Sequence, residues 1–520
     1  MLFLLVQAVP IYSTFAEKKL FNHLPPGQVG AASKSDKSVK SQSRVRIDVE
    51  KLKNNVNINL PGHTGLQAVI EQKISTAGKS RYLIDSRFGE INKAGKKGFI
   101  SLSAAYDAHS GEEVLNGYIK TPQGKTFLIK QSGNNEQELI EIDESRQLGC
   151  SGSLQADHLH SENSRHSTWI NQAEAGSQNN TTINLLIAYT PDALSTAGSS
   201  ASMQALINNM VVNTNLAHSN SATGIVYAIS GTHLLSESSS DNFFNDINNA
   251  VNHSSGKWDE LASLREQHCA DQVVVIVGGT SNNTICGIAL LGATENNVTP
   301  SKNSMFSIVS ANQVICNYLT FAHELSHNLG AQHDYNNSAQ NAVFGSAYGH
   351  RFVGSSANQY RTVMAYAPGA RIPYFSNPHV NYEGTATGTQ TANNAHTLTV
   401  NGAIVANFYS SETCSSYIPG PSPTPPINTS PLIEPDKINL STRIQSNRAN
   451  FTVKAVSNGK GAKGVTISVF FNKKAKGNFS RRIARVKTNA KGIRKFSKQR
   501  KRGFYVACHE DLCSRKRRLR

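Results

Sequence analysis

Histidine and glutamate side chains at fixed spacing mark the middle of the chain, in the segment TFAHELSHNLGAQHD at 320–334. His323 and His327 are four residues apart, so on an α-helix both imidazoles lie on one face. Glu324 is displaced to the side, where it can accept a proton from a water molecule beside a metal ion. The pattern H-E-x-x-H therefore predicts a helix that presents two metal ligands and one general base.

A third ligand follows within the same segment. A zinc ion that does chemistry keeps three protein ligands and one open position. Gly330, three residues past His327, can adopt the left-handed conformation that ends a helix and turns the chain sharply. That turn carries His333 back toward the first two histidines. The sequence thus predicts one catalytic zinc ion on His323, His327 and His333, with Glu324 as the base.

A second motif, RTVMAY at 361–366, lies downstream. It resembles the Met-turn of the metzincin clan of zinc endopeptidases, in which a methionine forms a hydrophobic floor beneath the metal. Met364 would be that methionine, and the alternative is an ordinary core methionine. Asp334, directly after the third histidine, is similar to the reprolysin-type branch of the clan, where it would orient its neighbours around the Met-turn.

Three further segments are more similar to bacterial peptidyl-Asp metalloendopeptidases. They are LLIAYTPDAL at 185–194, CGIALLGA at 286–293 and RIPYFSNPHV at 371–380. The resemblance covers about residues 180–414. It implies a catalytic domain of the α/β (α+β) class with a twisted mixed sheet, which hydrolyses peptide bonds in protein substrates.

The resemblance also implies roles for residues around the metal. An antiparallel edge strand would pair with an extended substrate through its main chain, and we place it at Gly287, Ile288 and Ala289. Tyr366 matches a tyrosine that in some branches binds zinc or the tetrahedral intermediate, although a packed aromatic is the alternative. Arg371 would bind an acidic side chain at P1′, since a guanidinium suits carboxylates. Arg361 competes for this role, and a merely solvated arginine is the alternative.

Apolar runs and helical spacing predict the elements of this domain, which we bound at 181–414. We expect strands at 183–190, 224–235, 271–279, 286–292 and 306–312, and helices at 203–221, 258–268 and 396–411.

The region before the catalytic domain, 17–180, alternates in the manner of β-strands and is read as a mostly β prodomain with a polar linker from Ser151 onward. Cys150 stands at the end of the β region. A propeptide thiolate can occupy the open position of a zinc ion, so Cys150 is a candidate zymogen latch. The alternative is a cysteine without a metal role. We expect cleavage within the linker.

The first 16 residues are apolar and too short to span a bilayer, and they are interpreted as a signal peptide, the alternative being an amphipathic or buried N-terminal segment. We therefore expect a secreted protein, and four of its seven cysteines fall in the catalytic domain. Pairing Cys286 with Cys316 and Cys269 with Cys414 is plausible, yet four cysteines allow three pairings.

The C-terminal part is strongly basic. A proline-rich spacer at 415–435 precedes residues 436–520, where β-like alternation predicts an immunoglobulin-like sandwich with Cys508 and Cys513 closing a loop. This region holds 25 Lys and Arg against 3 acidic residues, a net charge of +22, whereas the whole chain carries +17. Such a module binds polyanions. Since no base-reading motif accompanies the charge, an anionic cell surface or polysaccharide is favoured over specific nucleic-acid binding.

Two functions remain open at this point. The first is a monomeric, secreted zinc endopeptidase made as a zymogen. The second is an adhesion protein with an inactive protease-like domain, whose basic module binds anionic surfaces. The complete set of Glu324, His323, His327 and His333 favours the enzyme.

Overall fold

The computed structural model describes two compact units, 1–420 and 421–520. In the first unit the described residues are 20–24, 36–47, 55–63, 66–76, 82–93, 96–107, 112–133, 136–150, 154–155, 181–252, 256–280, 284–338 and 342–409. In the second they are 437–445, 448–457, 460–461, 466–472, 481–487, 489, 491, 493–499, 503–509, 512–513 and 517–519. The predicted signal peptide and proline-rich spacer lie outside these ranges. Among the helices described, none is both long and apolar enough to cross a bilayer.

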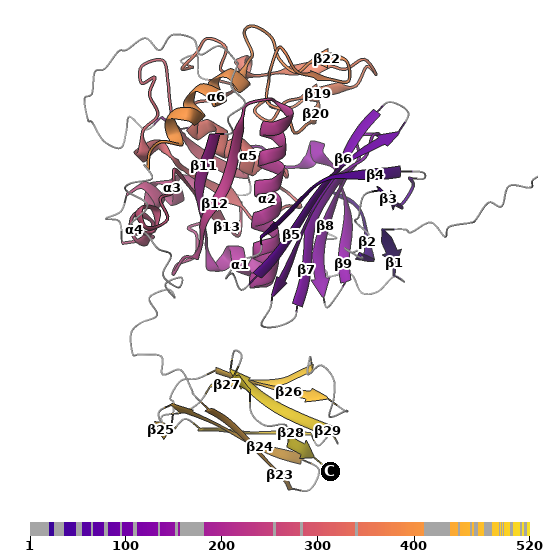
Figure 1. Ribbon diagram of the computed structural model, residues 1–520, viewed down its shortest axis with the longest axis vertical. Coiled ribbons are helices and arrows are strands. Elements are labelled where there is room, and N and C mark those ends of the chain that lie inside the picture. Colours follow the sequence, from indigo (N-terminus) through magenta and orange to yellow (C-terminus); the bar gives the residue numbers. More distant parts are fainter. Residues whose placement is uncertain are drawn as a thin grey trace, which may run out of the picture. The chain divides into compact units, whose positions relative to one another are not determined.

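The N-terminal part of the first unit is one nine-stranded antiparallel sheet (Figure 1). Strands β3 to β9 follow one another as a meander, and β2 and β1 complete the sheet beside β9. The mostly β character predicted for this region is confirmed. Its strands are β1 (Phe21–His23), β2 (Val39–Ile47), β3 (Asn55–Ile58), β4 (Leu66–Thr76), β5 (Tyr82–Lys93), β6 (Lys96–Asp107), β7 (Glu112–Lys120), β8 (Thr126–Gly133) and β9 (Glu136–Ile142). A short 3₁₀ turn, η2 (Glu144–Arg146), follows β9.

Both faces of this sheet are apolar. Because side chains alternate along a strand, Phe127 and Ile129 of β8 pack into the sheet's own core, whereas Leu128 between them points to the opposite face. Leu139 and Ile140 of β9 divide in the same way. The side chains on the second face, such as Leu128 and Ile140, are buried in one hydrophobic cluster with side chains of the domain that follows in the chain.

The catalytic sheet has six strands in the order β10-β14-β15-β13-β11-β12. Its pairs are parallel except β14 with β15, which is antiparallel, so the predicted mixed sheet is confirmed. All six residues of the central strand β13 are buried, as suits a strand covered on both faces. The strands are β10 (Leu154–Gln155), β11 (Thr181–Tyr189), β12 (Ile225–Leu234), β13 (Gln272–Val277), β14 (Gly287–Leu291) and β15 (Phe306–Ser310).

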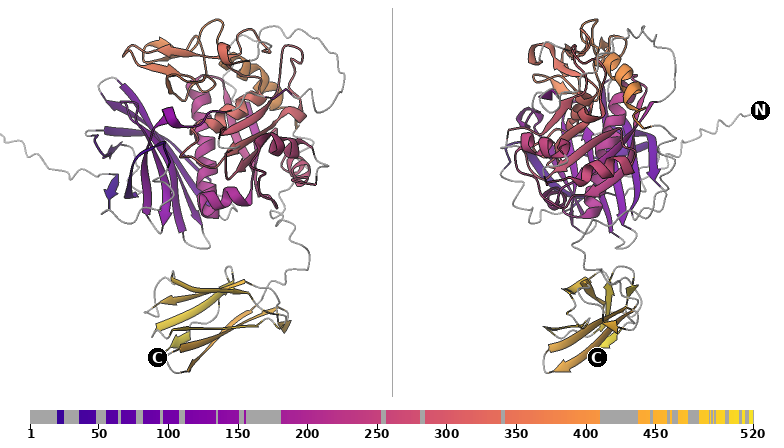
Figure 2. Two further views of the ribbon diagram at one scale, coloured as in Figure 1. Left: turned by 180° about the vertical axis from the view of Figure 1, so that it is seen from behind. Right: turned by 90° about the vertical axis from the view of Figure 1, so that its left-hand side faces the viewer.

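Six helices accompany the sheet, and α2 lies between it and the N-terminal sheet (Figures 1 and 2). The three expected helices correspond to α2, α4 and α6. Helix α6 begins earlier than expected because the Asn393 side chain accepts a hydrogen bond from His396 N. The helices are α1 (Pro191–Ala197), α2 (Ser200–Asn220), α3 (Phe243–Val251), α4 (Glu260–Gln267), α5 (Thr320–Asn328) and α6 (Asn394–Val405). The 3₁₀ turns η4 (Lys302–Ser304) and η5 (Tyr335–Asn337) complete the set.

The rest of the first unit is made of short strands around the end of α5. They are β16 (Gln332–Asp334), β17 (Tyr348–Gly349), β18 (Arg351–Val353), β19 (Gln359–Arg361), β20 (Ala370–Arg371), β21 (Asn381–Tyr382) and β22 (Thr385–Ala386). A disulfide joins Cys286 to Cys316. Cys269 is also disulfide-bonded, and its expected partner Cys414 lies outside the described residues.

The linker differs in one respect from the expectation that it begins at Ser151. Leu154 and Gln155 form β10, which pairs in parallel with Leu290 and Leu291 on the outer edge of β14. The sequence SGSLQ gives no strand signal. The pairing is explained by the main-chain groups along the edge of β14 opposite β15, which are available for another strand.

The second unit contains two antiparallel sheets, β23-β24-β25 with β28 beside β24, and β27-β26-β29-β30 with β31 beside β29. Strand β23 contacts β29, β30 and β31 of the other sheet. The immunoglobulin-like assignment stays a prediction. The strands are β23 (Lys437–Gln445), β24 (Arg448–Ser457), β25 (Lys460–Gly461), β26 (Thr466–Asn472), β27 (Arg481–Lys487), β28 (Ile493–Gln499), β29 (Gly503–His509), β30 (Leu512–Cys513) and β31 (Arg517–Leu519).

Candidate metal centre

Helix α5 is fixed within the core. All nine of its residues are buried, so the histidines cannot turn toward solvent. At its end the Asn328 Nδ2 group donates to the carbonyl oxygens of Leu290, Ser304 and Phe306 at 2.8–3.0 Å. These bonds tie the helix to the ends of the two strands that form the antiparallel pair.

The three histidine rings converge on one point. The Nε2 atoms of His323, His327 and His333 lie 3.0, 3.0 and 3.2 Å apart. A tetrahedral zinc ion with bonds of 2.0–2.1 Å separates two ligand nitrogens by about 3.3 Å. The spacing therefore fits a single ion of that size.

The other ring nitrogens show which tautomer is present. The Nδ1 atoms of His323, His327 and His333 lie 2.9, 2.7 and 3.2 Å from the carbonyl oxygens of Val363, Ala331 and Asn337. A carbonyl oxygen only accepts, so the Nδ1 atoms of His327 and His333 carry the hydrogen and their Nε2 atoms keep a lone pair. His323 Nδ1 also lies 3.0 Å from Arg371 Nη2, and we assign the same tautomer there from the shorter contact with the Val363 carbonyl. Three lone pairs that face one another have no hydrogen to share, and a cation satisfies all three.

Burial keeps these imidazoles neutral. It lowers the pKa values of His323 and His327 well below the ordinary value and that of His333 to about 4. Neutral imidazole is the form that binds a metal.

The turn after the helix has the geometry expected of Gly330. Its φ is +86°, and a Cβ there would stand 3.1–3.2 Å from Asn401, Ala293 and Val343. A side chain at this position would be strained by both the backbone and its neighbours.

Asp334 joins the third histidine to the Met-turn. Its carboxylate accepts hydrogen bonds from Tyr366 N at 3.0 Å and Asn337 Nδ2 at 2.8 Å, and it pairs with Arg351 at 2.7 Å. Met364 is fully buried in the same core cluster as α5. The Val363 carbonyl, one residue earlier, is the acceptor for His323 Nδ1.

Glu324 is buried beside the imidazoles. Both carboxylate oxygens lack a hydrogen-bond partner among the described residues, and burial raises the pKa of this group to about 8. Space for the carboxylate comes from Gly287 on β14, because a Cβ there would lie 2.5 Å from Glu324 Oε1. The edge strand that contains Gly287, Ile288 and Ala289 thus runs directly beside Glu324.

Cys150 reaches the same site from the N-terminal region. Its Sγ, a nitrogen of His323 and a carboxylate oxygen of Glu324 all lie within 4.8 Å of one another. Burial raises the pKa of the thiol well above its ordinary value. The Cys150 carbonyl accepts a hydrogen bond from the Tyr366 hydroxyl at 2.7 Å.

We call residues 147–150 together with β10 the strap. Leu148 N donates to Ile315 O at 2.9 Å, and Cys286 N donates to Gly149 O at 2.8 Å. These bonds precede Cys150, and the pairing of β10 with β14 follows it, so the strap is held by main-chain pairing before and after this residue.

Arg371 contacts His323 at Nδ1, the ring nitrogen that faces away from the other two histidines. It is 4% exposed, its Nη2 lies 3.0 Å from His323 Nδ1, and Nε has no partner. No ion pair of Arg371 occurs among the described residues. Arg361, by contrast, donates to the carbonyl oxygens of Gly369 and Ala365 at 2.9 and 2.8 Å.

Sequence reasoning missed two polar groups of the N-terminal region that contact the catalytic domain. Lys120 pairs with Glu144 at 2.6 Å, and its ammonium also donates to the Arg371 carbonyl at 3.3 Å. The Gln147 side chain donates to Val314 O and Cys316 O, both at 3.1 Å. A lone lysine in a predicted strand carries no signal of such a contact.

Comparison with known proteins agrees with this site. Residues 179–376 match the model of metallopeptidase family M12. A "Peptidyl-Asp metalloendopeptidase" of Stenotrophomonas maltophilia strain R551-3 is 29% identical over 309 residues, 58% of this chain and 69% of that protein. The protein of the same name from Xanthomonas campestris pv. campestris is 27% identical over 311 residues, 59% of this chain and 70% of its own.

One solved structure is more distant. A chain in "Structure of a chaperone-substrate complex" aligns with a TM-score of 0.36 and 21% identity, over 45% of this chain and 36% of that chain.

The family match spans the helix with His323 and His327, the turn to His333 and the Met-turn. With its converging imidazoles and buried glutamate, this part of the chain is similar to the metallopeptidase domain of family M12, and the protein is a metalloendopeptidase.

Proposed function

We propose that the protein is a secreted zinc endopeptidase made as a zymogen. The observation that carries the proposal is the convergence of three Nε2 lone pairs beside the carboxylate of Glu324. Three imidazoles at this spacing suit zinc. Secretion is supported by the Cys286–Cys316 disulfide and by the disulfide bond of Cys269, because disulfides persist in oxidising compartments.

The catalytic roles follow from these positions. When bound, zinc polarises the scissile carbonyl and makes the attacking water more acidic. Glu324 accepts the proton of that water and passes it to the leaving amine. The Tyr366 hydroxyl, which donates to a carbonyl of the strap, donates to the oxyanion of the tetrahedral intermediate once the strap has left.

Extended substrates bind along β14. In this proposal the main-chain groups of Gly287, Ile288 and Ala289 hold the peptide, which makes binding largely independent of sequence. Support comes from the strap, since β10 already adds to this edge as a short strand.

Cys150 blocks the centre before maturation. Its thiolate takes the open coordination position while the strap fills the substrate groove. The short distances from Sγ to His323 and Glu324 support this role over that of a cysteine without a metal contact.

Arg371 selects acidic residues at P1′. A buried guanidinium without a carboxylate partner is costly, and an acidic substrate side chain removes that cost. The printed name of the similar bacterial enzymes, peptidyl-Asp metalloendopeptidase, points in the same direction.

The basic region at 436–520 attaches the enzyme to an anionic surface or polysaccharide. Its net charge of +22 supports this role, and the proposal makes no use of specific nucleic-acid binding.

The Glu324→Ala variant tests the central claim. Mature enzyme should hydrolyse casein and lose activity with a chelator, and the variant should lose about 10²–10⁴-fold in rate because the base is gone. Zinc content should stay at one ion per chain, since Glu324 is not a ligand. Activity near the wild-type level in a zinc-loaded variant would refute the assigned base.

Replacing Cys150 by Ser tests the latch. Uncut Cys150→Ser protein should hydrolyse a peptide at least about 10-fold faster than uncut wild type, because a hydroxyl competes poorly for zinc. Initial rates are measured on chains shown by mass spectrometry to be intact. Ser145→Ala, an exposed change on η2, is the control. Equal rates for all three proteins would rule out the latch.

Arg371→Met tests the specificity. We expect kcat/KM for a peptide with Asp at P1′ to fall about 10- to 100-fold, because the carboxylate loses a charged hydrogen bond, with little change for Ala at P1′. Zinc content is measured because Arg371 contacts His323. The paired variant Arg361→Met decides between the two arginines, and loss of Asp preference in that variant alone would assign the role to Arg361.

Deletion of 436–520 tests the basic region. The shortened enzyme should elute from heparin and from anionic vesicles at lower salt, while casein hydrolysis is unchanged. Retention equal to that of the full chain would remove the proposed role.

A further inference from the structure

The N-terminal region and the catalytic domain share one hydrophobic core. Phe99, Tyr118 and Leu128 of the N-terminal sheet are buried in the same cluster as Tyr318 and Phe321 beside the metal centre. The rings of Tyr118 and Tyr318 are in contact, with centroids 5.0 Å apart and planes tilted by 38°. The two regions therefore pack as parts of one folded body rather than as neighbours joined by a tether.

Helix α2 is buried on two sides. One side packs on the catalytic sheet and on α5, and the other contacts β5, β6 and β7 (Figures 1 and 2). Ala201 and Ala205 pack against Ala105 and Val114 of the N-terminal sheet. A helix with one face in water would carry polar residues at these positions.

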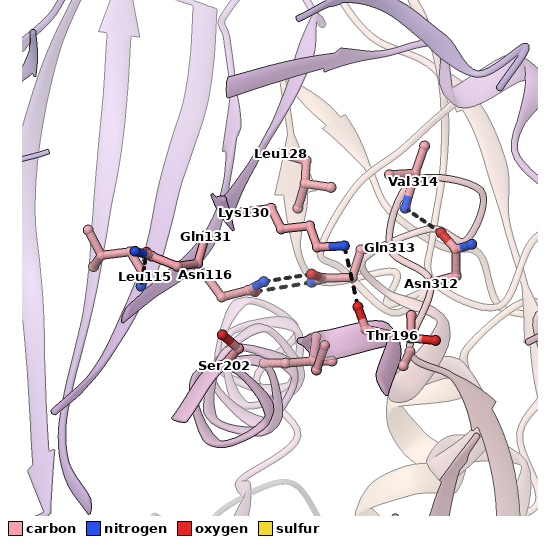
Figure 3. A pocket seen from close by; sticks show the side chains of 13 residues that line it. Leu115, Asn116, Leu128, Lys130, Gln131, Thr196, Ser202, Asn312, Gln313 and Val314 are labelled. Carbon is pink, nitrogen blue, oxygen red and sulfur yellow. Dashed lines mark hydrogen bonds between the residues drawn. The ribbon is translucent and has the colours of Figure 1, made fainter. Parts of the chain in front are cut away.

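Polar contacts fix the position of the N-terminal sheet relative to the catalytic domain (Figure 3). Asn116 donates to Gln313 Oε1 at 2.6 Å, and Gln313 donates back to Asn116 Oδ1 at 3.1 Å. Both amides are buried. Lys130 Nζ donates to Thr196 O at 3.4 Å on the other side of a small pocket between the two regions.

A further bond ties the middle of α2 to the sheet. Asn209 Nδ2 donates to the carbonyl and hydroxyl oxygens of Ser101 at 3.3 and 3.0 Å, and both residues are fully buried. Because each of these groups would lose a buried partner on separation, the interface resists opening.

The strap is held differently. Its main chain bonds to Ile315 and Cys286, and its Gln147 side chain bonds to the carbonyls of Val314 and Cys316. The sheet holds α2 and Gln313 through separate side-chain bonds. A cut after the strap removes the covalent tether and changes none of the sheet's contacts.

We propose that cleavage within 156–180 leaves the N-terminal region, from β1 to β10, bound to the catalytic domain as a non-covalent inhibitory subunit. Activity then needs a second event that degrades or displaces this subunit. This inference rests on the proposed zymogen, and it adds that the linker cut alone does not activate the enzyme.

Association is tested apart from catalysis. A cleavage site for an unrelated protease is placed within 156–180 of the full chain carrying Glu324→Ala, so that self-digestion does not interfere. After complete cutting, the two fragments should co-elute on size exclusion at nanomolar concentration and in high salt, since the contacts are mainly apolar. Separate elution under these conditions would overturn the inference.

Interface variants show whether the observed contacts hold the fragments. Gln313→Ala leaves the Asn116 amide without a partner, and the dissociation rate of the cut protein should rise about 10- to 100-fold. Ala205→Glu places a carboxylate against Ala105 and should release the subunit altogether. Asn245→Ala, an exposed amide on α3, is the matched control and should not change the rate. Equal rates for all variants would show that other contacts hold the complex.

The same cut in the Glu324-containing chain separates the two proposals. Zinc-loaded cut protein should be inactive on casein until a second protease or mild denaturant removes the subunit. Immediate full activity with co-elution would overturn the inhibitory role. No activity after complete removal of the subunit would instead count against the proposed enzyme, while the co-elution result would stand.

Discussion

The structure depends on three imidazole lone pairs that point at one another inside a buried site. Each Nδ1 donates to a main-chain carbonyl, so none of the three rings can turn its lone pair away without losing a bond. The carbonyls come from three different places in the chain: the Met-turn, the turn after α5 and η5. The backbone around the site is therefore built to keep the rings in a metal-binding tautomer.

Other side chains and one glycine also hold the metal ligands and Glu324 in place. Asp334 ties the third histidine to the Met-turn, and Asn328 ties α5 to the sheet. Gly287 leaves the space in which the Glu324 carboxylate lies, so one contact positions both the proposed substrate edge and the proposed base. Moving any of these groups would shift either the metal ligands or the base relative to the groove.

Much of this site could be predicted from sequence because its spacing is local. The positions of His323, His327 and Gly330 follow from helix geometry, and the apolar runs of β11 and β13 are unmistakable buried strands. The surroundings of Cys150 and Arg371 could not be predicted in this way, since they depend on long-range packing. The pairing of β10 with β14 depends on an open sheet edge, and the contact of Lys120 with the Arg371 carbonyl depends on how the N-terminal sheet packs against the following domain.

The strap raises the question of why the enzyme would not cut its own chain there. It lies on the edge at which we propose that substrates bind, and the Cys150 carbonyl accepts a hydrogen bond from the tyrosine proposed to hold an oxyanion. The strap differs from a peptide substrate in the Cys150 side chain. Sulfur stands near His323 and Glu324, where the attacking water must sit, so the base faces a thiol instead of its reactant. In the proposed zymogen, the main-chain bonds of Leu148 and Gly149 hold the strap beside the metal centre while the sheet packs on α2, so inhibition would depend on the whole interface rather than on one cysteine.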